Sequence, residues 1–138
     1  MKKVLFLCTG NSCRSQMAEA LVNDRLGDRW RAYSAGTQPA GYVHPLAVQV
    51  LAEIGIEHSG ESKNVEAVGV IDFDLVVTVC DSAAETCPLW LREGRVTHLP
   101  FEDPAKAVGS PEEVLNIFRG VRDEITKQIP ALLQQFER

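Results

Sequence analysis

The strongest constraint on the fold is a nearly continuous apolar run, Lys3–Leu7, that is followed at once by a short loop and a helical pattern. A strand made of consecutive apolar residues has both of its faces covered, which is typical of parallel sheets. The apolar spacing after the loop predicts a helix from Ser15 to about Leu26. The first 26 residues therefore predict a strand–loop–helix unit of an α/β fold.

The alternation of strands and helices continues along the chain. The predicted elements are a strand over 31–35, a helix over 45–54, a strand over 74–80, a helical turn over 81–86, a strand over 95–99 and a long helix from Pro111. Pro130 is expected to kink or fray that last helix. We predict a single α/β domain over residues 1–138, with three layers, a four-stranded, mostly parallel sheet and helices on both faces.

Composition and charge exclude several classes of function. The net charge is −5 and no basic stripe is present, which argues against nucleic acid as a partner. No stretch approaches the ~20 apolar residues that a membrane span needs. The first apolar run is too short for a secretory signal and ends in polar residues. We expect a cytoplasmic protein with no membrane partner, and a monomer.

The loop after the first strand carries a thiol at one end, Cys8, and a guanidinium at the other, Arg14. Such a loop can turn successive N–H groups inward around a tetrahedral oxyanion, and the next helix adds its positive end. The predicted substrate-binding residues are Thr9, Gly10, Asn11, Ser12, Cys13, Arg14 and Ser15. In these surroundings Cys8 is expected to be a nucleophilic thiolate, whereas the alternative is a small buried core residue.

Two further candidates, Cys80 and Asp103, also follow predicted strands. The carboxyl ends of parallel strands meet at one edge of a sheet, so we expect these side chains to converge on Cys8. Asp103 precedes a proline and could simply form a turn. Its place after a strand favours a general acid that protonates a leaving oxygen.

Cys80 and Cys87 are seven residues apart. In a helix their Cα atoms would be separated by roughly 10 Å, beyond the ~7 Å that a disulfide tolerates, so bonding them would require unwinding. The alternative is that Cys80 is a buried strand end and Cys87 an incidental surface thiol.

The chain has no Cys-x2-Cys pair and its three histidines are scattered, so no metal site is predicted.

These groups allow two chemistries. Attack of Cys8 on a phosphate ester needs only one cysteine and an acid. Attack on arsenate gives an adduct from which Cys80 can expel arsenite, leaving a Cys8–Cys80 disulfide that Cys87 then displaces to form Cys80–Cys87. An external reductant would complete this cycle without a bound cofactor.

The motifs Cys8–Ser15, Gln16–Ala20, Ser34–Gly36, Val76–Cys80, Cys87-Pro88 and Asp103-Pro104 resemble the thioredoxin-coupled arsenate reductases, which share the fold of the low-molecular-weight protein tyrosine phosphatases. The resemblance implies Cys8 as nucleophile, Arg14 as transition-state clamp, Asp103 as general acid, Cys80 and Cys87 as the relay, and thioredoxin as partner. It also implies that Asn11 and Ser15 shape the loop and bond Cys8, and that Cys13 is structural.

Some members of that family bind a potassium ion with residues that match Asn11, Glu19 and Ser34. The neighbouring stretch here, Ser59–Lys63, lacks the histidine found in those members, so a monovalent cation stays an open expectation. A phosphatase is the main competing function, although residues 104–110 supply no aromatic ring and predict featureless pocket walls. The sequence is also compatible with a non-catalytic oxyanion sensor, and with glutaredoxin or glutathione in place of thioredoxin as the electron donor.

Overall fold

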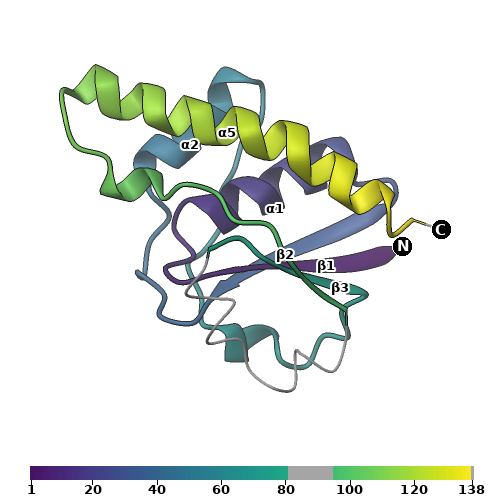
Figure 1. Ribbon diagram of the computed structural model, residues 1–138. Helices are drawn as coiled ribbons and strands as arrows, with labels where there is room; N and C mark the ends of the chain where they lie inside the picture. The colour runs from purple at the N-terminus through teal and green to yellow at the C-terminus, as the bar shows by residue number, and fades with distance from the viewer. Residues whose placement is uncertain (81–94, 138) are drawn as a thin grey trace.

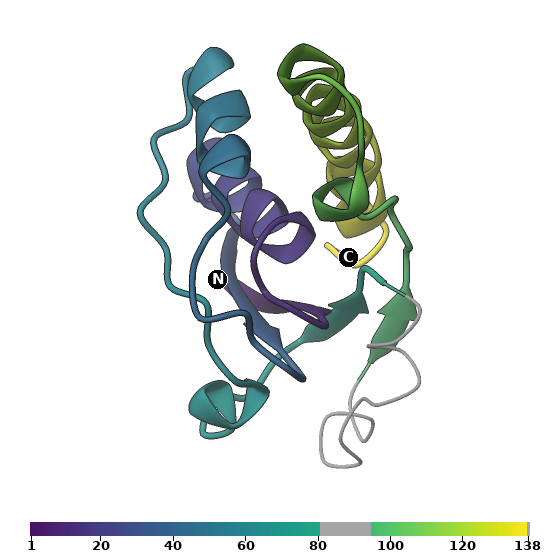
Figure 2. The same cartoon turned by 90° about the vertical axis from the view of Figure 1, so that its left-hand side faces the viewer.

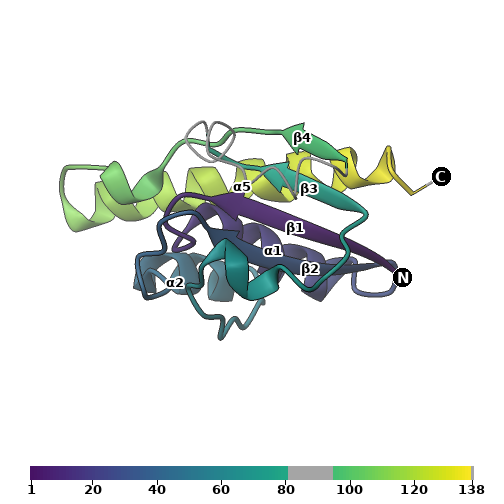
Figure 3. The same ribbon diagram turned by 90° about the horizontal axis from the view of Figure 1, so that it is seen from below.

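The computed structural model describes residues 1–80 and 95–137, and its centre is a sheet of parallel strands. The strands are β1 (Lys2–Cys8), β2 (Trp30–Gly36), β3 (Leu75–Thr78) and β4 (Val96–His98). Their order is β2-β1-β3-β4, which Figure 3 shows from below. Cys8 pairs with Gly36 and Leu7 with Thr78, so the strands end at a common edge.

Among the described residues, three α-helices lie together on one face of the sheet: α1 (Arg14–Arg25), α2 (Pro45–Glu53) and α5 (Pro111–Gln134) (Figures 1 and 2). The short 3-10 helix η1 (Val65–Val68) lies on the opposite face and contacts β2. Helices therefore flank both faces, as predicted, and the long ones gather on one side. A second 3-10 helix, η2 (Pro104–Lys106), packs against α5.

The sequence places most element boundaries within two residues, and the differences have local causes. Strand β3 ends at Thr78, not at Cys80, so Cys80 lies two residues beyond the end of the strand. Helix α5 continues through Pro130, contrary to the expected fraying, because the fully buried Ile129 and Leu133 dock it on either side. The predicted helical turn over 81–86 and Cys87 lie outside the described residues.

The core sits on both faces of β1. Val4–Leu7 are completely buried, which is the cause of the continuous apolar run in the sequence. On the helical face, Met17 and Leu21 of α1 and Phe118 of α5 are also inaccessible. No helix in residues 1–80 or 95–137 is long and apolar enough to cross a membrane.

We predict that Phe118→Ala destabilises the protein by about 3–5 kcal/mol. The ring is 0% exposed, so its removal leaves a cavity where α5 packs on α1 and α2. Urea unfolding followed by circular dichroism measures this loss. Val108→Ala is the control, since Val108 is 91% exposed and should change stability by less than about 0.5 kcal/mol. Equal effects of the two substitutions would contradict the assigned core.

Candidate active site

The loop between β1 and α1 wraps its own first residue. Cys8 is 2% exposed, and its Sγ lies 2.9 Å from Ser15 Oγ. The backbone N–H of Asn11 donates to the same sulfur at 3.1 Å. The sulfur is thus contacted by a backbone N–H and by a hydroxyl. The structure thus brings Cys8, Asn11 and Ser15 together, which is the arrangement that the resemblance implies.

Asn11 fixes the shape of this loop. Its φ is 48°, in the left-handed region that asparagine tolerates better than most residues, and its side chain is fully buried. Its Nδ2 donates to Ser15 Oγ at 2.8 Å, and its Oδ1 accepts from the backbone N–H of Lys63 at 2.9 Å. The unusual backbone is therefore held from both sides.

The backbone carbonyls of the loop accept hydrogen bonds from the segment that precedes α2. Gln38, Ala40 and His44 donate their backbone N–H groups to the carbonyls of Thr9, Gly10 and Ser12 at 2.8–3.0 Å. The chain can approach this closely because position 36 is glycine: a Cβ there would lie 2.5 Å from the Thr9 carbonyl oxygen.

The N–H groups of the loop are left for a ligand. Within residues 1–80 and 95–137, no acceptor binds the N–H groups of Gly10, Ser12 or Cys13, and α1 begins without a side-chain cap. Free N–H groups at the start of a helix form an anion site. The arrangement suits a tetrahedral oxyanion seated beside Cys8.

Arg14 and Asp103 meet at the mouth of this loop. Arg14 Nη2 lies 3.5 Å from Asp103 Oδ2, and Nη1 donates to the Phe101 carbonyl at 3.2 Å. Asp103 also caps η2 by accepting from the Ala105 N–H at 3.0 Å. Both side chains are partly accessible, at 12% and 26%. The cation and the candidate acid are thus held where an incoming anion would lie.

A cavity of about 450 Å³ opens over the loop. It is lined by Cys8, Thr9, Gly10, Asn11, Ser12, Cys13, Arg14, Ala40, Tyr42, Cys80, Asp103, Ala105 and Lys106. Cys80 therefore shares a cavity with Cys8, and its Sγ lies 3.3 Å from Thr9 Oγ1. Every predicted site residue in the described ranges lines this cavity except Ser15, which is buried beneath it.

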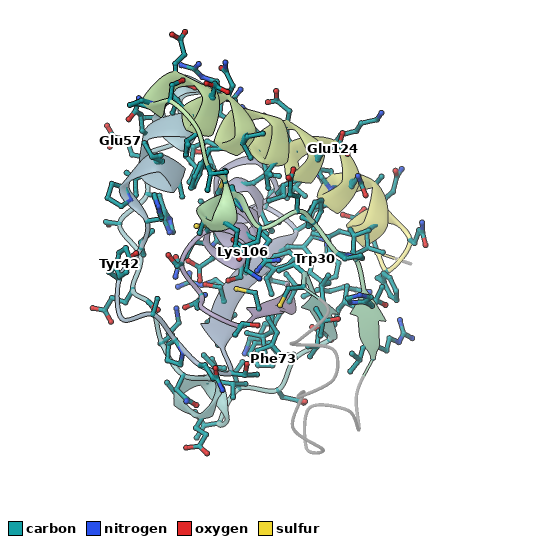
Figure 4. All side chains as sticks on the ribbon, turned by 60° about the vertical axis from the view of Figure 1, so that its left-hand side comes forward. Trp30, Tyr42, Glu57, Phe73, Lys106 and Glu124 are labelled. Carbon is teal, nitrogen blue, oxygen red and sulfur yellow. The ribbon has the colours of Figure 1, made fainter. Side chains whose placement is uncertain are left out.

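Tyr42 and Lys106 are wall residues that the sequence reasoning missed. Figure 4 shows them on separate segments: Tyr42 before α2 and Lys106 at η2. The expectation of featureless walls is therefore wrong, because an aromatic ring comes from a segment far from Asp103 in sequence. A glycine-flanked tyrosine, Gly41-Tyr42, is too weak a signal to find it.

Gln16 anchors the loop from below and was also missed. Its Nε2 donates to the Asn11 carbonyl and side-chain oxygens, both at 3.1 Å, and to the Glu61 carbonyl at 2.8 Å. His58 Nε2 lies 2.7 Å from Gln16 Oε1, and burial lowers the pKa of His58, which favours a neutral ring.

In the described part of the chain, no three His, Cys, Asp or Glu side chains gather as a metal site.

Cys13 lies in the loop with a different environment from Cys8. It is 4% exposed, and burial raises its pKa to about 12. Its only side-chain hydrogen bond among the described residues is a long one of 3.8 Å to Ser12 Oγ. The inference that Cys13 does not act as a nucleophile rests on this burial.

Comparison with known proteins gives close matches over nearly the whole chain. A sequence model described as low molecular weight phosphotyrosine protein phosphatase matches residues 3–138. The arsenate reductases of Halalkalibacterium halodurans and Bacillus subtilis are 49% and 43% identical over 129 residues, covering 93% of this chain and 92% of each relative. These matches confirm the resemblance drawn from the motifs.

Solved structures agree with this. An arsenate reductase in the phosphate binding state superposes with a TM-score of 0.81 at 30% identity and 99% coverage of both chains. A low molecular weight protein tyrosine phosphatase from T. tengcongensis gives a TM-score of 0.78 at 26% identity, covering 98% of this chain and 99% of that one.

We predict that Cys13 resists alkylation in the folded protein. With a pKa of about 12 instead of 9.0, its thiolate fraction at neutral pH falls about 1,000-fold. Iodoacetamide labelling followed by peptide mass spectrometry measures the rate, and the same protein in guanidinium chloride is the control. Rapid folded-state labelling of Cys13 would contradict its assigned burial.

Proposed function

Because the chain belongs to the low molecular weight phosphotyrosine protein phosphatase family, we propose that it uses the family's oxyanion loop to reduce arsenate to arsenite. The observation that carries the proposal is that Cys80 lines the same cavity as Cys8, Arg14 and Asp103. A phosphatase needs Cys8, Arg14 and Asp103 but does not need a second thiol. The names of the relatives, arsenate reductases at 40–49% identity, support the same interpretation.

In the first step, Cys8 Sγ attacks the arsenic atom of bound arsenate. An S–As bond forms, an As–O bond breaks, and Asp103 donates the proton with which that oxygen leaves as water. Arg14 and the free loop N–H groups balance the negative charge on the remaining oxygens. Arsenic is still pentavalent at this stage.

In the second step, the Cys80 thiolate attacks Cys8 Sγ. The S–As electron pair passes to arsenic, which leaves as trivalent arsenite, and the two sulfurs form a Cys8–Cys80 disulfide. Cys80 Sγ contacts the hydroxyl of Thr9, the residue after Cys8, and this proximity supports Cys80 as the attacking thiol.

In the third step, Cys87 attacks Cys80 and expels the Cys8 thiolate, leaving a Cys80–Cys87 disulfide. Thioredoxin then supplies two electrons that restore both thiols. Cys87 enters from the sequence alone, seven residues after Cys80. We place this cycle in the cytoplasm, where thiols are kept reduced.

Phosphatase activity is the second candidate, and Tyr42 favours it. Its ring lines the cavity and is 55% exposed, as a group that stacks on a phenyl ester would be. The first chemical step is common to both activities, so a slow phosphatase activity is expected to accompany arsenate reduction.

We predict that Cys80→Ser lowers thioredoxin-coupled arsenate reduction at least about 100-fold while p-nitrophenyl phosphate hydrolysis is kept, because only the reduction needs the second thiol. Oxidation of NADPH by thioredoxin reductase, thioredoxin and arsenate measures the first activity. Cys8→Ser should lose both activities. A Cys80→Ser variant that still turns over at the parent rate would refute the relay.

For Cys87→Ser we predict one arsenite per protein and then arrest. Because the Cys8–Cys80 disulfide can no longer be displaced, it should accumulate as a species lighter by about 2 Da, with Cys8 linked to Cys80 in peptide maps. Sustained turnover would remove Cys87 from the cycle. Arsenate binding without arsenite release in the parent would instead indicate an oxyanion sensor.

We predict that Asp103→Asn lowers kcat for arsenate by about 10²–10⁴, because the leaving oxygen is no longer protonated. Inorganic sulfate binding, measured by titration calorimetry, should be kept, since the substitution removes a negative charge 3.5 Å from Arg14. An equal loss of kcat and sulfate affinity would make Asp103 a structural residue.

A further inference from the structure

Three residues that match the potassium ligands of some family members can be tested as a cation site here. Ser34 Oγ donates to Glu19 Oε1 at 3.2 Å, joining β2 to α1, and Ser34 is fully buried. Burial raises the pKa of Glu19, and the nearby charge of Lys63 is the largest influence in the opposite direction. Asn11 belongs to the oxyanion loop above them. A carboxylate and neutral oxygens are present, as a monovalent cation requires.

A lysine ammonium already lies beside the Glu19 carboxylate. Lys63 Nζ lies 3.9 Å from Glu19 Oε1 and 3.2 Å from the Glu61 carbonyl oxygen. Both side chains are largely covered, with 27% of Lys63 and 14% of Glu19 accessible. A second cation bound to Glu19 would lie close to this ammonium and be repelled by it. The residues present therefore do not fit a resident potassium ion.

We propose that the Lys63 ammonium replaces a bound monovalent cation in this chain, neutralising Glu19 and thereby holding the oxyanion loop in shape. Lys63 is a positioning residue, since it does not line the cavity over Cys8.

The connection from the ammonium to the loop is short. The backbone N–H of Lys63 donates to Asn11 Oδ1 at 2.9 Å, and the backbone carbonyl of Lys63 accepts from the Gly36 N–H at 2.8 Å. The Glu61 carbonyl, which contacts the ammonium, also accepts from Gln16 at 2.8 Å, and Ser62 Oγ donates to the Gly10 carbonyl at 3.0 Å. Segment 61–63 is thus bonded to the loop at several points.

The same contacts explain why the charge matters. Removing the ammonium would leave the Glu19 carboxylate, which is mostly buried, without its nearest cation. Arg31, on the neighbouring strand, acts on Glu19 more weakly and is exposed. Segment 61–63 would then lose one of its ties to α1 and keep the bond from Gln16 to the Glu61 carbonyl, and the bond from Lys63 to Asn11 would loosen.

The test compares potassium chloride with tetramethylammonium chloride at equal ionic strength, using the melting temperature and the dissociation constant for inorganic phosphate. The parent should give the same values in both salts. Lys63→Met should melt several degrees lower and bind phosphate about 10-fold more weakly in tetramethylammonium chloride, and potassium should restore both values by occupying the vacated position.

Two further variants make the result specific. Lys63→Met combined with Glu19→Gln should not respond to potassium, because the carboxylate that holds the ion is gone. Lys127→Met, which removes an exposed lysine on α5, should behave like the parent. Neither readout involves arsenate or electron transfer, so the result is independent of the proposed function.

The proposal is overturned if potassium stabilises the parent as much as it stabilises Lys63→Met, because the parent would then bind the ion beside Lys63. It is equally overturned if Lys63→Met does not respond to potassium, or if the variant lacking Glu19 responds as Lys63→Met does.

Discussion

The whole site depends on one residue held in an uncommon backbone conformation. Asn11 turns the chain with a φ of 48°, and this turn directs its own N–H to Cys8 Sγ. A left-handed conformation is unfavourable in isolation and persists only where its surroundings fix it. Here Ser15, Gln16 and Lys63 each bond the Asn11 side chain. Helix α1, which contains Ser15 and Gln16, and the segment before η1 thus both hold the anion site in shape.

Two cysteines five residues apart illustrate how strongly this shape decides reactivity. Cys8 receives an N–H from Asn11 and lies beside the Ser15 hydroxyl. Cys13 is buried with one long bond to Ser12, and its pKa is raised to about 12. Composition alone treats the two thiols as equal. Cys8 is a candidate nucleophile because of the groups that contact its sulfur, whereas burial keeps the Cys13 thiol protonated.

The sequence alone is sufficient to predict the site residues that follow strands. Cys8, Cys80 and Asp103 could be brought together because parallel strands end at one edge, and Arg14 because its spacing from Cys8 spans one loop. Tyr42, Gln16 and Lys63 could not be found in this way. Tyr42 and Lys63 lie in irregular segments, and Gln16 owes its role to its contacts with the loop and with one such segment; no periodic pattern encodes these contacts. Likewise, Pro130 continues a helix because buried neighbours hold it.

The hydrogen bonds that tie the carbonyls of Thr9, Gly10 and Ser12 to segment 38–44 have a consequence for selectivity. A loop made rigid by its neighbours spends little entropy when an ion arrives, so it offers a ready cradle to any tetraoxo species of suitable charge. Sulfate, phosphate and arsenate have nearly the same shape, and such a cradle distinguishes them poorly. The protein must then distinguish these ions after binding, by how readily the central atom accepts an electron pair. Abundant cellular phosphate would therefore act as a competitive inhibitor that occupies the loop without reacting.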